Sequence, residues 1–224
     1  MKHLLILALL FSSNLVAQRF NAGAVFGVNF SQIDGDYQFG FNKKGIAAGA
    51  RAIAYLSPLV ELNIDLLYSQ RGARPSRRRA NVVHMNLNFI ESIFLLNIKV
   101  PKTQEAEATN RRRKRRKLNT FVPFQIHTGL SYGRLIHSEV VEIRRPAYVQ
   151  FAEQEVSFEE IRASFNKNDI SIVGGFSYFF NPNIGSSFRF HVPTKKLYDS
   201  ASFPDRTSRS MRSFFITAQL IYLL

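Results

Sequence analysis

The chain ends in FFITAQLIYLL, residues 214–224, and this stretch decides the fold class. Successive side chains of a β-strand point to opposite faces, so one set can contact lipid while the other lines a lumen. The alternation therefore predicts a membrane-spanning strand. One face carries Phe214, Ile216, Ala218, Leu220, Tyr222 and Leu224, and the other carries Phe215, Thr217, Gln219, Ile221 and Leu223.

Seven further segments show the same alternation, which gives eight predicted strands. A mature chain of about 207 residues suits one domain of eight strands of about ten residues each with their loops. The sequence thus predicts an all-β protein, an eight-stranded antiparallel up-and-down transmembrane β-barrel that fills residues 18–224. The earlier segments are residues 20–31, 44–56, 59–70, 83–100, 121–135, 169–180 and 184–192.

The N-terminal residues have the composition of a secretory signal. Lys2 precedes the unbroken apolar run 4–11, and Leu15-Val16-Ala17 offers a cleavage site after Ala17. The run is shorter than the roughly 20 residues of a spanning helix, although an uncleaved anchor is the alternative. Residues 1–17 are therefore predicted to be a signal peptide. The chain has no cysteine, which excludes a disulfide, a thiolate metal site and a lipid-modified cysteine.

Loop lengths alternate along the chain. Long links follow the first, third, fifth and seventh segments, and the longest is a predicted outer loop at 136–167. Short links follow the second and sixth, so both chain ends are predicted in the periplasm. The link at 102–119 breaks the rule, because it should be a short periplasmic turn but is long, polar and predicted to be disordered.

The formal charge of +14 is concentrated in two cationic runs. The first is Arg77–Arg79, and the second lies in the 102–119 link. Export argues against nucleic acid as a partner, so lipopolysaccharide, other outer-membrane lipids or another anionic envelope surface is the predicted partner class. A solvated turn without a partner is the alternative. The anionic-surface contact would use Arg111, Arg112, Arg113, Lys114, Arg115, Arg116 and Lys117.

Charged residues at lumen-facing positions predict a polar plug, because buried charges are stable only when paired. An enzyme would have to use His84, His127, His137 or His191, of which His127 shares its predicted lumen face with Ser131. The strands show no catalytic signature, and no two histidines have metal-ligand spacing, so no catalytic residue, metal or cofactor is predicted. The predicted plug residues are Arg51, Glu61, Asp65, Asp169 and Arg189.

Several short motifs carry a resemblance to a known family. They include 29–35 (NFSQIDG), 67–72 (LYSQRG), 88–91 (NFIE), 129–133 (GLSYG) and 174–176 (GGF). With these motifs the chain resembles the PorT-like outer-membrane β-barrel proteins of Bacteroidetes-type bacteria. The resemblance implies a barrel in the outer membrane of a Gram-negative envelope, and one branch of that family is tied to protein secretion.

The predicted function is that of a non-enzymatic outer-membrane barrel with a structural or interaction role. A lumen of eight strands is too narrow for an open aqueous channel, which disfavours a porin. Two alternatives stay open: an accessory component of a protein-secretion machine, and an outer-membrane enzyme acting on lipid or peptide.

Overall fold

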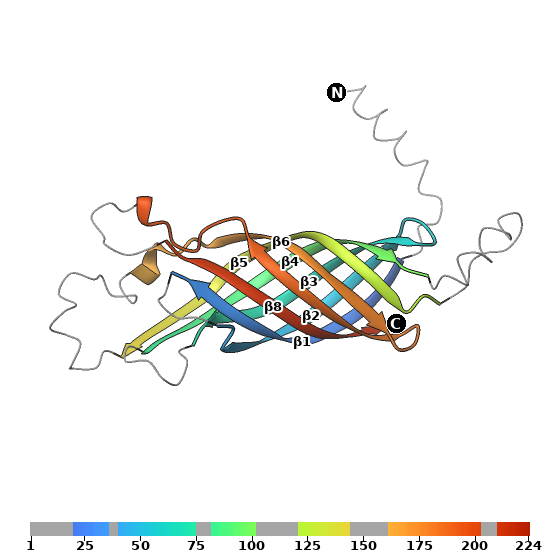
Figure 1. Cartoon of the computed structure of the whole chain (residues 1–224), viewed down its shortest axis with the longest axis horizontal. Helices are drawn as coiled ribbons and strands as arrows, with labels where there is room; N and C mark the ends of the chain where they lie inside the picture. The colour runs from blue at the N-terminus through green and yellow to red at the C-terminus, as the bar shows by residue number, and fades with distance from the viewer. Residues whose placement is uncertain (1–19, 36–39, 75–81, 102–120, 144–160, 203–209) are drawn as a thin grey trace, which may run out of the picture.

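The computed structural model describes residues 20–35, 40–74, 82–101, 121–143, 161–202 and 210–224. These residues form eight antiparallel strands in which each strand pairs with the next and β8 pairs with β1, so the sheet is a closed barrel (Figure 1). This confirms the predicted fold class. The strands are β1 (Phe20–Asp34), β2 (Lys43–Tyr55), β3 (Val60–Ala73), β4 (Val82–Lys99), β5 (Phe124–Ile143), β6 (Asn168–Phe179), β7 (Ile184–Pro193) and β8 (Arg212–Leu223).

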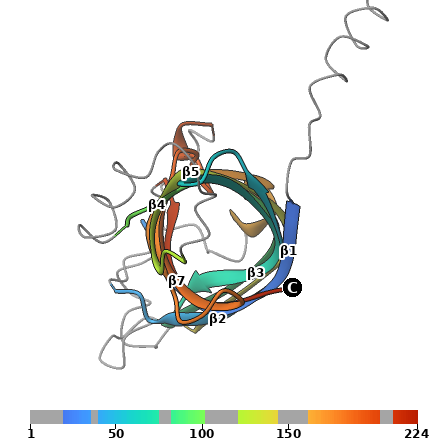
Figure 2. The ribbon, with the colours of Figure 1, turned by 90° about the vertical axis from the view of Figure 1, so that its right-hand side faces the viewer.

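The register fixes the width of the barrel. Followed from strand to strand, the pairing that leaves β1 at Phe20 returns to β1 at Phe30, so the stagger is ten residues. Eight strands with this stagger tilt by about 40° and enclose an interior that side chains can fill. Figure 2 shows the ring of strands end-on. Phe20 and Leu223 lie at one end, here the terminal end, together with the short turns 56–59 and 180–183.

Inward and outward side chains alternate along every strand. On β1, for example, Val25 is 2% exposed and the next residue, Phe26, is 58% exposed. The outward faces form an apolar belt that on β1 runs from Phe20 to Phe30. Ten residues at about 3.3 Å each, tilted by about 40°, span about 25 Å along the barrel axis. This matches the apolar band of about 25 Å in outer-membrane barrels.

The belt ends abruptly at polar residues toward the other end of the barrel. These outward-facing residues of β2, β3, β4, β5 and β8 are here called the rim. They are Lys44, Gln70, Asn88, Arg134 and Arg212.

An apolar cluster closes the barrel beyond the rim, and this end is here called the cap end. Side chains from the strand ends meet residues from two links, which contain the short 3₁₀ helices η2 (Arg162–Ser164) and η3 (Ser200–Ser202). This apolar cap seals the lumen by burial of hydrocarbon rather than by ion pairs. It comprises Ile33, Ala73, Met85, Leu87, Phe89, Val140, Ile161, Phe165, Leu197, Tyr198 and Met211.

Two strands extend further than the sequence predicted. β5 was expected to end at residue 135, before the 136–167 loop, but it continues to Ile143 because β4 supplies pairing partners from Val82 to Asn88. The register shifts at Asn88/Phe89, where Ile136 is an extra residue that disturbs the alternation. β3 likewise runs through Arg71 and Gly72 to Ala73. The first eight residues of the predicted outer loop 136–167 therefore belong to β5.

Three predicted segments lie outside the described residues: the signal peptide 1–17, the Arg77–Arg79 run, and the 102–119 link with its cations Arg111 to Lys117. They stay predictions. The predicted segment 121–135 begins too early, because Val122 precedes β5 and is buried at the terminal end. In the part of the chain that is described, no helix is long and apolar enough to cross a membrane.

Candidate functional site

The middle of the lumen holds one carboxylate between two guanidinium groups, here called the central ion cluster. Asp65 on β3 lies directly opposite Arg51 on β2 in the register. Arg51 donates from Nε and Nη2 to both carboxylate oxygens of Asp65, at 2.7 and 2.8 Å. Arg189 on β7 extends its side chain across the lumen and donates from Nη1 to Asp65 Oδ2 at 2.8 Å. All three side chains are at most 2% exposed, so this cluster joins two walls of the barrel.

A second cluster, the cap-end ion cluster, has the opposite composition, with one guanidinium between two carboxylates. Arg71 on β3 lies 2.9 Å from Glu91 Oε1 on β4 through Nη2, and 2.7 Å from Asp169 Oδ2 on β6 through Nη1. Its guanidinium carbon also lies 3.8 Å from the ring centre of Phe215 and 4.5 Å from that of Phe89. Arg71 is therefore held by two ion pairs and by two aromatic rings.

Two more side chains lie against Glu91. The hydroxyl of Ser131 donates to Glu91 Oε1, and Nδ1 of His191 lies 3.7 Å from the same oxygen. The imidazole of His191 stacks on Phe215 with a centroid distance of 3.9 Å. The cap-end ion cluster thus shares Phe215 between a cation and a histidine ring.

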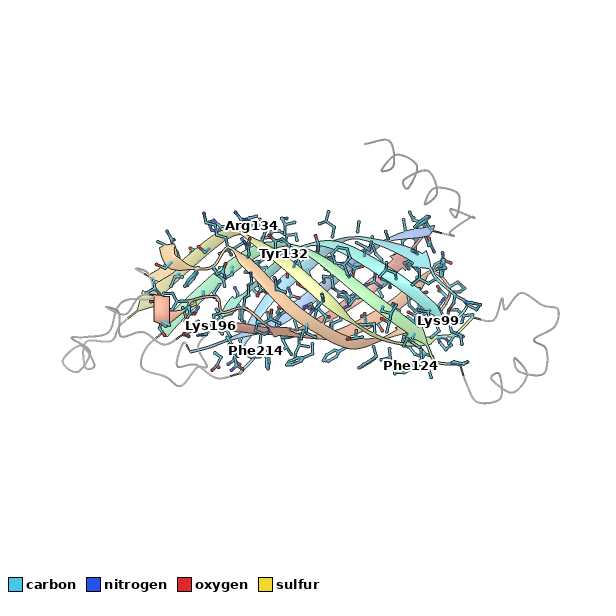
Figure 3. All side chains as sticks on the ribbon, turned by 90° about the horizontal axis from the view of Figure 1, so that it is seen from above. Lys99, Phe124, Tyr132, Arg134, Lys196 and Phe214 are labelled. Carbon is cyan, nitrogen blue, oxygen red and sulfur yellow. The ribbon has the colours of Figure 1, made fainter. Side chains whose placement is uncertain are left out.

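The terminal end holds a single ion pair, between Glu61 on β3 and Lys99 on β4, at 2.9 Å. Asn97 donates to Glu61 at 3.4 Å and to Gln125 at 3.2 Å. The side chain of Lys99 is 19% exposed, and Figure 3 shows this residue at the end opposite to Arg134. A pocket of about 180 Å³ opens here, lined by Ile53, Tyr55, Glu61, Lys99, Phe121, Val122, Gln125, Phe179, Pro182 and Leu223.

Taken together, these three groups balance their charges. Arg51, Arg71, Arg189 and Lys99 supply four positive charges, and Asp65, Glu91, Asp169 and Glu61 supply four negative charges. An ion that crossed this lumen would have to displace paired side chains in a medium of low dielectric, which is strongly unfavourable.

In the part of the chain that is described, buried polar atoms without hydrogen-bond partners occur around the central ion cluster and also at the cap end, where they include Nη2 of Arg71 and both ring nitrogens of His191. Asn63 stands on β3 between Glu61 and Asp65, and Ser187 on β7 faces Gln219 on β8 in the register. Among the described residues, both amide atoms of Asn63 and Gln219 and the hydroxyl of Ser187 have no hydrogen-bond partner. The same holds for Nε and Nη2 of Arg189. This group is here called the unpaired layer.

The five residues predicted as a plug all lie in the lumen, but they belong to three separate groups. Arg51, Asp65 and Arg189 contact one another, whereas Glu61 pairs with Lys99 and Asp169 with Arg71. Arg71, Glu91 and Lys99 are members that the sequence did not predict. Arg71 has the inward parity of β3, but the predicted segment 59–70 ends one residue before it. Glu91 and Lys99 share one parity of the predicted segment 83–100, which is the inward face of β4.

The histidine and serine considered for catalysis have different partners. His127 Nδ1 lies 3.4 Å from the hydroxyl of Ser177, while Ser131 donates to Glu91. His127 and Ser131 therefore do not pair with each other. Within the described ranges, no group of three His, Asp or Glu side chains could hold a metal ion.

The link between β7 and β8 at the cap end is held by one carboxylate. Asp199 accepts hydrogen bonds from Lys196 Nζ at 2.9 Å, from the Ala201 amide at 3.2 Å and from Ser210 Oγ at 3.2 Å. The hydrogen bond from Lys196, with the backbone amide second, holds the pKa of Asp199 below its usual value.

Comparison with known proteins gives matches of architecture only. A scan against models of protein families finds no match, and a search of curated proteins finds no similar sequence. Ail, the attachment invasion locus protein of Yersinia pestis, crystallised with the heparin analogue sucrose octasulfate, is 8% identical, with a TM-score of 0.44 over 92% of this chain and 99% of that one. Neisserial surface protein A is 11% identical, with a TM-score of 0.41 over 91% of this chain and 96% of that one. A designed transmembrane β-barrel is 10% identical, with a TM-score of 0.39 over 91% and 95%.

Proposed function

We propose that the protein is a non-enzymatic outer-membrane β-barrel with a closed lumen and a structural or interaction role in the cell envelope. One observation carries the proposal: an apolar belt of membrane thickness surrounds a lumen filled by charge-balanced ion pairs. The belt needs lipid, since contiguous apolar surface of this extent is unfavourable in water. The filled lumen leaves no path for solute.

The apolar belt and the predicted signal at residues 1–17 together support a position in the outer membrane. The terminal end would face the periplasm and the cap end the exterior, as the short turns indicate. The proposal is tested by cell fractionation and by gel mobility with and without heating. We expect a precursor cut near Ala17, and an outer-membrane band whose mobility changes on heating. A soluble protein with intact Met1 and unchanged mobility would contradict the proposal.

The closed lumen is tested by electrical recording. Purified barrel in planar bilayers should show no sustained ion conductance, because the central and cap-end ion clusters both obstruct the path. Stable open channels would show that these ion pairs break easily, and that the protein transports solute.

The finer role rests on the sequence resemblance. PorT-like membership and an accessory role in secretion are supported only by the short motifs quoted above. An interaction with an anionic envelope surface is supported by the predicted run from Arg111 to Lys117, which lies in the link between β4 and β5. A pull-down of the native barrel from outer membranes, with the seven cations intact or replaced by serine, tests both. If a secretion complex is recovered with both the parent barrel and the serine variant, an accessory role in secretion is supported. If an anionic partner is recovered with the parent barrel only, the residues Arg111 to Lys117 are supported as its contact.

A further inference from the structure

Around the rim residue Arg134, the surface of β5 and β6 carries cations that no described carboxylate neutralises. Arg134 is exposed, and its Nη1 donates to Asn168 Oδ1. The hydroxyl of Tyr132, two residues earlier on the same outward face, donates to the same oxygen at 3.1 Å. Figure 3 shows Tyr132 and Arg134 side by side on the outer surface of the barrel. Asn168 thus holds a guanidinium and a phenol hydroxyl together at the boundary of the belt.

The carboxylates described near this sector are already engaged. Asp169 faces inward and pairs with Arg71, and Asp199 binds Lys196. Glu139, further along β5 beyond the register shift, accepts a hydrogen bond from Asn86 on β4. Two exposed lysines, Lys167 just before β6 and Lys195 just after β7, add positive charge. The local field therefore favours an anion.

The opposite side of the rim supplies a natural contrast. Arg212 on β8 is also exposed and outward-facing, but the register places Asp34 of β1 directly opposite it. Opposite charges on paired strands stabilise each other, so the attraction of Arg212 for an external anion is reduced. Arg134 has the amide oxygen of Asn168 in the corresponding position.

The surface directly below Arg134 is apolar on both strands. Leu130 faces Ile172 across the β5–β6 pair, and Tyr132 faces Ile170. Leu130 is 56% exposed and Ile172 is 50% exposed, so these side chains form a continuous track within the belt. A molecule with an anionic head and hydrocarbon chains fits this arrangement, with the head at Arg134 and the chains along the track. A free anion would leave the track unused.

We propose that Arg134 and Tyr132, held together by Asn168, bind the phosphate group of an outer-leaflet lipid whose chains pack on Leu130, Ile170 and Ile172. The inference rests on the proposed membrane position. Guanidinium binds phosphate through directed, charge-assisted hydrogen bonds, and the tyrosine hydroxyl can redirect its proton from Asn168 to a phosphate oxygen. Lys167 and Lys195 raise the local concentration of anionic lipid without fixing its orientation.

The test is native mass spectrometry of the mature barrel refolded in neutral detergent micelles. The probes are dioleoyl phosphatidic acid, which carries a phosphate monoester, and dioleoylglycerol, which has the same chains without phosphate. We expect the barrel to retain phosphatidic acid in preference to dioleoylglycerol. Arg134→Gln should weaken that retention by about tenfold, the size of one charge-assisted hydrogen bond. The matched control Arg212→Gln should change retention less than about twofold, because the side chain it removes already faces Asp34.

Tyr132→Phe sharpens the assignment, since it removes one hydroxyl and keeps the apolar track. It should weaken retention of phosphatidic acid by a few-fold and leave dioleoylglycerol unaffected. Equal losses in Arg134→Gln and Arg212→Gln would overturn the site, because they would reflect general surface charge. Displacement of phosphatidic acid by inorganic phosphate at equal concentration would also overturn it, since the track would then contribute nothing.

The outcome separates this site from the proposed function. A barrel that enters micelles and shifts on heating, yet shows no preference for phosphatidic acid, would overturn the lipid site alone. A protein that does not enter micelles would overturn both.

Discussion

The two ends of the lumen neutralise their charged side chains in different ways. At the cap end, Arg71 binds two carboxylates and two aromatic rings, and the apolar cap excludes water above it. At the terminal end, Glu61 and Lys99 form one ion pair beside a pocket. We infer that the cap end contributes most of the stability of the lumen, and that the terminal end is held more weakly.

The largest expected effect comes from Arg71→Met. The change keeps most of the apolar stem but leaves Glu91 and Asp169 buried without their cation. Removing one partner of a buried ion pair typically destabilises a protein by about 3–5 kcal/mol. We expect the urea midpoint of the barrel in liposomes, followed by heat-dependent gel mobility, to fall accordingly. A midpoint unchanged from that of the parent protein would show that the cap end does not depend on this cluster.

A smaller effect is expected from Lys99→Met at the terminal end. Lys99 is partly exposed, and the pocket beside Glu61 allows water to solvate the carboxylate that remains. Ion pairs with access to solvent contribute about 1 kcal/mol or less. The same urea titration should therefore show a shift several times smaller than that of Arg71→Met. Equal shifts in the two variants would show that the ion pairs at the two ends contribute equally to stability.

Much of this comparison could be predicted from the sequence, because parity along a strand fixes which side chains enter the lumen. Parity alone predicts five lumen residues: Arg51, Glu61, Asp65, Asp169 and Arg189. The pairing itself depends on the stagger of the barrel, which sets which strands face each other across the lumen. No local pattern shows that Arg189 reaches Asp65 on β3, 124 residues away in the chain.

The cap end was less predictable for a different reason. Its apolar cap joins residues from strand ends and from two links, such as Phe165 and Leu197, which have no common periodicity. The extension of β5 arises from pairing with β4 rather than from its own alternation, which the extra residue Ile136 interrupts. The apolar cap and the extension of β5 depend on contacts between segments far apart in the chain. The residue pattern of a single segment does not predict such contacts.

The unpaired layer predicts a third, still smaller effect. Gln219→Met replaces an amide without described partners by an apolar side chain of similar size. Because no hydrogen bond is lost and a buried polar group is removed, we expect stability within about 0.5 kcal/mol of the parent protein, or slightly higher. Ser131→Ala is the control from the cap end. It deletes a hydroxyl that donates to Glu91 and should destabilise the barrel by about 1–3 kcal/mol.

These two variants compare a buried lumen side chain that has a hydrogen-bond partner with one that has none among the described residues. If Gln219→Met were as destabilising as Ser131→Ala, the amide of Gln219 would have hydrogen-bond partners in the membrane-embedded protein.

The smallest effect concerns the link that covers the cap end, where Asp199 binds Lys196, the Ala201 amide and Ser210. Its pKa is lowered from the usual 3.8, so the carboxylate is ionised more readily in the folded protein. This contribution is present above the usual pKa and is lost as the pH falls through the lower, folded value. The amide resonance of Ala201 should therefore titrate with a midpoint below 3.8, while the urea midpoint barely changes because Asp199 is exposed to solvent. Asp199→Asn should abolish that titration. A midpoint at or above 3.8 would mean that Lys196 does not hold the carboxylate, and that the link covers the cap without this anchor.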